Sequence, residues 1–149
     1  MSEYSDFESI PIGLDMEAVE VTLDANIADD RLGVDQWWAG ELVGKLSIAG
    51  PLTSIDQHPR MRFAKLPDLP ASIWAKSEHE FLKPMKMGSR ILIRGKIVDK
   101  DVKRGSNYIV SEFEAVDETG EVLLRSRETF VSNIEEEKHG KYREDSKIR

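Results

Sequence analysis

The chain has 149 residues, of which 40% are hydrophobic and 33% are charged, with a net charge of −7 and no cysteine. This length suits a single domain with a real core, and the balance of residues is typical of folded, water-soluble proteins. No apolar run reaches the roughly 20 residues that a membrane-spanning helix needs. Acids and bases are interspersed rather than gathered into a basic face, which disfavours nucleic-acid binding. We therefore expect a cytoplasmic protein that binds neither membranes nor nucleic acids.

The first half of the chain predicts one strand followed by helical segments. Residues 1–15 are expected to form an acidic arm, 16–134 a single domain and 135–149 a polar tail. Residues 17–24 alternate between apolar and polar side chains, which predicts a half-buried strand. The apolar spacing of residues 29–44 favours short helical turns. Gly50-Pro51 is expected to open a helix, and His58-Pro59 to stop or kink it. Residues 64–71 contain two prolines and predict a connecting loop.

The second half predicts a run of strands. Alternation of apolar and polar residues marks strands over residues 73–82, 90–98, 108–116 and 122–131, and turns are expected at 103–107 and 117–120. In the first of these strands, Ile73, Ser77, His79 and Phe81 fall on one face and Trp74 on the other. Strands joined by short turns pair antiparallel, so a four-stranded meander is predicted. With the helix covering one face, the fold class is α+β.

A resemblance to the MaoC-like hot-dog family is clearest in residues 78–91, EHEFLKPMKMGSRI. This stretch is similar to the family's strand, "FxxP…GD" turn and following strand, with Ser89 where the family usually has aspartate. The match extends over residues 73–131. The resemblance implies a hot-dog fold, in which an antiparallel sheet wraps around a central helix. It also implies acyl thioesters of coenzyme A or of carrier protein as substrates, with no other cofactor. Partner chains are expected to join edge to edge, as a homodimer or a heterodimer.

Active members of this family use an aspartate and a histidine in a D-x-N-P-x-H arrangement to hydrate enoyl thioesters or to dehydrate (3R)-hydroxyacyl thioesters. The corresponding stretch here, residues 29–38, reads DDRLGVDQWW and contains neither Asn-Pro nor histidine. Asp30 matches the acid, and Asp35 stands where the histidine is expected. The catalytic candidates are therefore Asp30, Asp56 and His58, the last as a base displaced from the usual place.

Further candidate residues follow from the same resemblance. Gly50 and Leu52 would present backbone donors to the thioester oxygen if a helix begins there. A second group comprises basic residues that would meet the phosphates of coenzyme A at a tunnel mouth, namely Arg60, Arg62, Lys65, Lys83 and Lys86. No metal site is expected, because three separated histidines without cysteine provide no usual ligand spacing.

Each candidate also has a plainer interpretation. His58 is more typical of a surface histidine at a helix end before proline. His79 is more typical of an inward, hydrogen-bonded core residue than of a catalyst, and His139 lies in the polar tail. Trp37, Trp38 and Trp74 are expected to anchor the core or a subunit interface rather than to line an acyl tunnel.

Three functions remain open at the level of sequence. The chain is a hydratase or dehydratase that works alone or in a heteromer, a non-catalytic subunit that shapes the acyl pocket of a partner, or a thioesterase that uses one of Asp30, Asp35 and Asp56.

Overall fold

The computed structural model describes residues 3–24, 48–50, 52–69 and 72–132. The elements in chain order are β1 (Val19–Thr22), β2 (Ile48–Ala49), α3 (Leu52–Ile55), α4 (Gln57–Lys65), β3 (Ile73–Phe81), β4 (Met85–Lys86), β5 (Arg90–Lys103), β6 (Ser106–Val116) and β7 (Val122–Val131). The predicted strands are confirmed, whereas the helical turns expected at 29–44 and the polar tail lie outside the described residues. No helix in the described part of the chain is long and apolar enough to cross a membrane.

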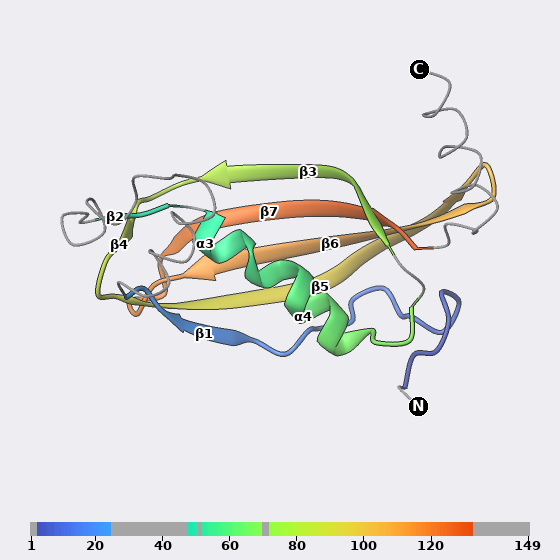
Figure 1. Cartoon of the computed structure of the whole chain (residues 1–149), viewed down its shortest axis with the longest axis horizontal. Helices are drawn as coiled ribbons and strands as arrows, with labels where there is room; N and C mark the ends of the chain where they lie inside the picture. Colours follow the sequence, from blue (N-terminus) through green and yellow to red (C-terminus); the bar gives the residue numbers. More distant parts are fainter. Residues whose placement is uncertain (1–2, 25–47, 51, 70–71, 133–149) are drawn as a thin grey trace, which may run out of the picture.

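One antiparallel sheet with the strand order β1-β5-β6-β7-β3 dominates the molecule. The two helices run across one of its faces, here called the inner face (Figure 1), and β2 pairs with β4 in a small separate sheet. The predicted α+β class is confirmed. The prediction of a four-stranded meander is wrong in one respect. β3 pairs with β7, at the far edge of the sheet, and not with β5. The strands joined by tight turns, β5 to β7, do form a meander.

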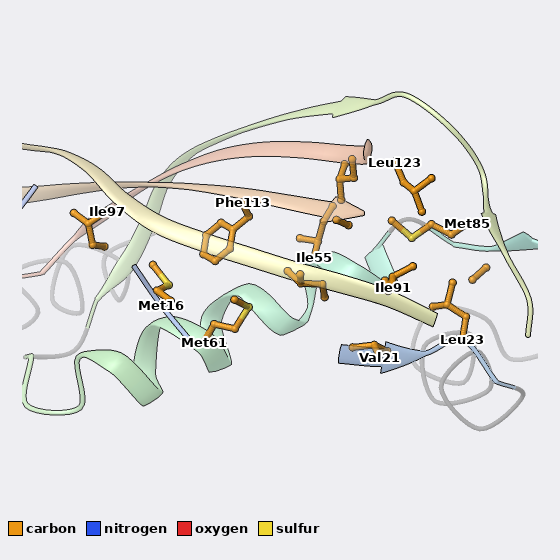
Figure 2. Packing of buried hydrophobic residues seen from close by; sticks show 14 of the residues in the cluster. Met16, Val21, Leu23, Ile55, Met61, Met85, Ile91, Ile97, Phe113 and Leu123 are labelled. Carbon is orange, nitrogen blue, oxygen red and sulfur yellow. The ribbon is translucent and has the colours of Figure 1, made fainter. Parts of the chain in front are cut away.

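The core lies between the helices and the inner face of β1, β5 and β6. Ile91, Ile93 and Ile97 of β5 are almost fully buried, as the alternation of that strand predicts. Ile55 of α3 and Met61 of α4 project from the helices towards the sheet (Figure 2).

Pro59 lies inside α4 and does not stop the helix, but the helical run is interrupted one turn before it. It is the third residue of that helix, where its missing N–H removes no intrahelical bond. A proline ring clashes with the carbonyl four residues earlier, which here belongs to Ile55. The helical run is interrupted at that point, where α3 ends and Asp56 separates it from α4.

The segment predicted as an N-terminal arm packs along β5. Ile10 is buried in the core. The Gly13 N–H donates to the Ile97 carbonyl at 2.7 Å, and the Met16 N–H donates to the Gly95 carbonyl at 2.8 Å. Residues 10–16 therefore extend the sheet edge beyond β1.

Charged side chains cover the outer face of the sheet, opposite the helices, and their sign alternates from strand to strand. Cross-strand neighbours place Glu78 and Glu80 of β3 beside Arg127 and Arg125 of β7. The same arginines face Glu112 and Glu114 of β6. The ion pairs on this face include Arg127–Glu112 at 2.5 Å and Arg125–Glu114 at 3.6 Å. The paired side chains are about half exposed, so this face is a solvated surface. Exposed ion pairs of this kind contribute little stability each.

The edge strand β3 is exposed along nearly its whole length. A register shift between Trp74 and Lys76 places Trp74 opposite Phe130, and the two rings stack with centroids 5.8 Å apart. Trp74 therefore shares the inner face with Ser77 and His79, which corrects the face predicted from simple alternation. A β-bulge adds one residue and reverses the alternation beyond it.

Candidate functional site

A histidine and a glutamate meet in the interior between α4 and β7. Nδ1 of His58 lies 2.7 Å from Oε1 of Glu128, and the two side chains are 1% and 0% exposed. The imidazole also stacks on the ring of Phe113, with centroids 4.0 Å apart and the planes 5° from parallel. The interpretation of His58 as a surface residue is therefore wrong, because the side of α4 that carries His58, Met61 and Arg62 is buried.

The hydrogen bond to Glu128 determines which nitrogen of His58 is free. An ionised carboxylate only accepts hydrogen bonds, so Nδ1 of His58 must donate. In the neutral imidazole, Nε2 is then an acceptor, and it has no partner among the described residues. An orienting carboxylate on one ring nitrogen with the other nitrogen free is the arrangement that general bases use.

A guanidinium group lies beside this pair. The Arg62 side chain is 6% exposed, and its central carbon sits 3.2 Å from the centre of the Phe130 ring. Burial lowers the pKa of Arg62 to about 10, and the negative charge of Glu128 opposes that shift. Arg62, one of the basic residues expected at a tunnel mouth, therefore lies in the interior with its charge beside that of Glu128.

Helical spacing and strand register bring further polar groups to the same place. Ser54, His58 and Arg62 recur at intervals of four residues, which places them on one side of the helical run. Ser111 of β6 lies directly opposite Glu128 of β7. We call these five residues the polar seam. Among the described residues, the buried side-chain atoms without a hydrogen-bond partner are Thr53 Oγ1, Ser54 Oγ, His58 Nε2, Arg62 Nη1, Ser111 Oγ and Glu128 Oε2.

Of the other catalytic and backbone candidates, those that the structure describes do not converge on the seam. Asp30 lies outside the described residues, and Asp56 is exposed at the junction of the helices. Gly50 precedes the predicted helix start, and its carbonyl accepts the Thr53 N–H at 3.0 Å. Leu52 begins α3 as predicted and is 40% exposed.

The remaining basic candidates line different hollows of the surface. Arg60 borders a groove of about 510 Å³ between β1 and α4, together with Lys65. Lys83 borders an apolar hollow of about 260 Å³ next to β2 and β4 and forms an ion pair with Glu121. Lys86 is exposed on β4. The described chain thus does not gather these cations around one entrance.

His79 behaves as its inward position predicts. It is half-buried on β3, and its Nδ1 lies 2.7 Å from the Ser126 hydroxyl. Ser126 neighbours His79 in the strand register, so the contact continues the polar row from β7 towards the exposed edge of the sheet.

Three seam residues, Ser54, Ser111 and Glu128, are absent from the sequence-based candidates. Glu128 occupies an inward position of β7, between Ser126 and Phe130 in the alternation. A carboxylate at a position where the strand pattern calls for an apolar side chain was the available signal, because such groups are buried only with partners.

Comparison with known proteins identifies the fold. No family model and no curated protein matches the sequence. The R-hydratase PhaJ1 from Pseudomonas aeruginosa superposes with a TM-score of 0.67 at 14% identity, covering 88% of this chain and 87% of that one. The (3R)-hydroxyacyl-ACP dehydratase complex HadBC from Mycobacterium tuberculosis superposes with a TM-score of 0.66 at 12% identity, covering 81% and 96%.

A hot-dog-like protein from Thermanaerovibrio acidaminovorans matches equally well, with a TM-score of 0.67 at 14% identity over 91% of this chain and 93% of that one. Identities this low establish the common architecture only. The chain therefore has the hot-dog fold, as its resemblance to MaoC-like proteins predicted.

Proposed function

We propose that this chain is a MaoC-like acyl-thioester protein that works as one subunit of an enoyl-thioester hydratase or (3R)-hydroxyacyl-thioester dehydratase. The exposed strand β3 is the observation that supports a partner chain most directly. Ile73, Trp74 and Phe81 are 50%, 45% and 60% exposed along it. An edge strand with apolar side chains and free backbone groups invites pairing with another strand. A second hot-dog chain would cover this edge.

The position of His58 also supports assembly with a partner. In the described chain, His58 is enclosed by Phe113 and Glu128, and the stretch that matches the family motif has Asp35 in place of histidine. Hydration needs a base that reaches the water or the substrate. A partner that carries the complete motif would supply that base, while this chain shapes the acyl site.

The test compares the chain alone with the chain co-expressed beside a second MaoC-like chain that carries the motif. Hydration of crotonyl-CoA is followed by the loss of enoyl absorbance, and thiol release is followed in parallel. We expect co-purification and turnover with the partner and none without it. Turnover by the chain alone would contradict the need for a partner. Thiol release without hydration would identify a thioesterase instead.

Phe81→Glu is expected to prevent assembly without unfolding the chain. Phe81 is exposed on β3, so a charge there costs the isolated chain little, whereas its burial against a partner would be costly. Size-exclusion chromatography with light scattering should show the monomer mass for this variant. Val102→Glu is the matched control, because Val102 is similarly exposed on β5, away from the β3 edge. A Phe81→Glu variant that assembles normally would exclude β3 as the interface.

A further inference from the structure

The strand β1 forms the edge of the sheet opposite β3, and one side of its backbone is open. Within the described part of the chain, β1 pairs with β5 alone. The Leu23 N–H donates to the Ser89 carbonyl at 2.9 Å, so the backbone groups of Leu23 face β5. Backbone groups alternate in direction along an antiparallel strand, which turns the N–H groups of Glu20 and Thr22 away from β5. A further strand could accept hydrogen bonds from these two donors.

A groove of about 510 Å³ lies beside this edge, between β1 and α4 (Figure 1). Its walls include Ala18 and Ala64, whose short side chains leave room for those of another chain. A strand added to β1 would point every second side chain to the inner face of the sheet, which is the face that α4 crosses. The groove is therefore placed to receive those side chains. An edge strand beside such a groove can bind an extended peptide as an additional strand.

The charge of the groove favours acidic side chains. Arg60 and Lys65 of α4 line it, and neither forms an ion pair with another described residue. Lys65 lies over the ring of Tyr4, with its Nζ 5.8 Å from the ring centre. The described lining contains one acid, Glu17, so its net charge is positive in a chain whose overall net charge is −7. Charge complementarity of this kind selects partners and orients them.

The outer face of the same edge favours basic side chains. Glu20 alternates with the buried Val21 and projects from the outer face. Its neighbour on β5 is basic, since Arg90 forms an ion pair with Glu20 at 3.5 Å. Opposite charges on adjacent strands are favourable and like charges are unfavourable. A strand added beyond β1 is therefore best matched with basic residues on its outer face and acidic residues on its inner face.

We propose that β1 and the groove beside α4 bind an extended segment of a partner protein in which acidic and basic residues alternate. The segment adds to β1 as an antiparallel strand, like the other strands of this sheet. Its acidic side chains enter the groove beside Arg60 and Lys65, and its basic side chains lie beside Glu20. This site is at the opposite edge from β3, so it goes beyond the proposed function and is compatible with subunit contact at β3.

The probe is a capped ten-residue peptide of alternating glutamate and lysine, and its binding to the purified full-length protein is followed by fluorescence anisotropy. Residues directly opposite in an antiparallel pair share a face. The peptide's lysines therefore lie opposite Glu20 and Thr22 and exchange backbone hydrogen bonds with them. N-methylation of two central lysines should weaken binding at least about tenfold, whereas N-methylation of two central glutamates should leave it unchanged. Hydrogen exchange at the Glu20 and Thr22 N–H groups, followed by NMR, should slow on binding.

Two variants of the protein test the backbone and the charge contacts separately. Thr22→Pro removes a donor on the open side of an edge strand, where proline is tolerated, and should weaken binding severalfold; thermal melting verifies its fold. Arg60→Glu together with Lys65→Glu reverses the charge of the groove and should weaken binding at least about tenfold. The control, Lys86→Glu with Arg104→Glu, makes the same change in net charge at exposed residues outside the groove and should keep the affinity.

The outcomes that would overturn the inference are distinct from those that test the proposed function. Failure of the alternating peptide to bind, or equal binding of its two N-methylated forms, would exclude strand addition at β1. Slowed exchange along β3 instead of β1 would place the peptide at the other edge of the sheet and would also overturn the inference. So would an affinity that the charge reversal at Arg60 and Lys65 leaves unchanged. Hydration of enoyl thioesters and assembly at β3 are measured independently of all these results.

Discussion

Replacing Glu128 by alanine is expected to lower the free energy of unfolding by about 3–5 kcal/mol, because it leaves the buried Arg62 charge without its counter-charge. The carboxylate is fully buried, bonds to His58 at 2.7 Å and opposes the burial-induced shift in the pKa of Arg62. Urea denaturation followed by circular dichroism measures the change. A loss of this size is a large fraction of the total free energy of unfolding of an ordinary protein.

The matched control is Glu112→Ala. Glu112 sits on the neighbouring strand and pairs with Arg127 on the exposed outer face, so its loss should cost about 0–1 kcal/mol. Replacing the whole cluster, with His58→Leu, Arg62→Met and Glu128→Leu together, should recover most of the stability that Glu128→Ala loses. Equal costs for the two single glutamate changes would contradict the account of a buried charge cluster.

Gly95→Ala is expected to destabilise the chain by about 1–3 kcal/mol through overpacking. A Cβ at Gly95 would lie 2.5 Å from the Phe113 ring, well inside contact distance. The same ring stacks on His58, so displacing it would also disturb the His58–Glu128 bond. The change is measured from chemical denaturation curves of the variant and the unaltered chain.

Two further variants identify the cause of that loss. Phe113→Leu should cost stability by itself but reduce the additional cost of Gly95→Ala, since the smaller side chain leaves room for the methyl group. Gly50→Ala serves as the glycine control, because nothing lies within 4 Å of a Cβ placed there and its φ is not positive. Additive effects of Gly95→Ala and Phe113→Leu would exclude the clash between them.

Much of the fold follows from local sequence patterns. The alternation that predicted residues 122–131 matches β7 (Val122–Val131), and the turns at Arg104-Gly105 and Gly120 contain the positive φ angles that such hairpins need. These local patterns do not predict which distant segments pair with one another. Nothing local to β3 indicates that it pairs with β7 rather than with β5, nor that a bulge after Trp74 turns this side chain inwards.

The candidate site was predictable only in part, for a related reason. His58 was identified by its residue type, but its environment depends on Glu128, which is 70 residues away in sequence. The rotation of α4 about its own axis decides whether His58 faces solvent or sheet, and the neighbouring proline pointed to a helix end. Polar residues at inward strand positions, such as Ser111 and Glu128, are the sequence feature that indicates a buried polar cluster.

The alternating charges of the outer face also affect whether copies of the chain can associate edge to edge into an open-ended assembly. Contact between β1 of one molecule and β3 of the next would be head to tail and would extend a sheet indefinitely into a fibre. Both of these edge strands present acids on that face, Glu20 on β1 and Glu78 and Glu80 on β3. Acid would meet acid at every such junction, whereas inside the sheet each acidic strand meets a basic one. Because like charges on neighbouring strands repel, this arrangement disfavours head-to-tail polymerisation of the chain.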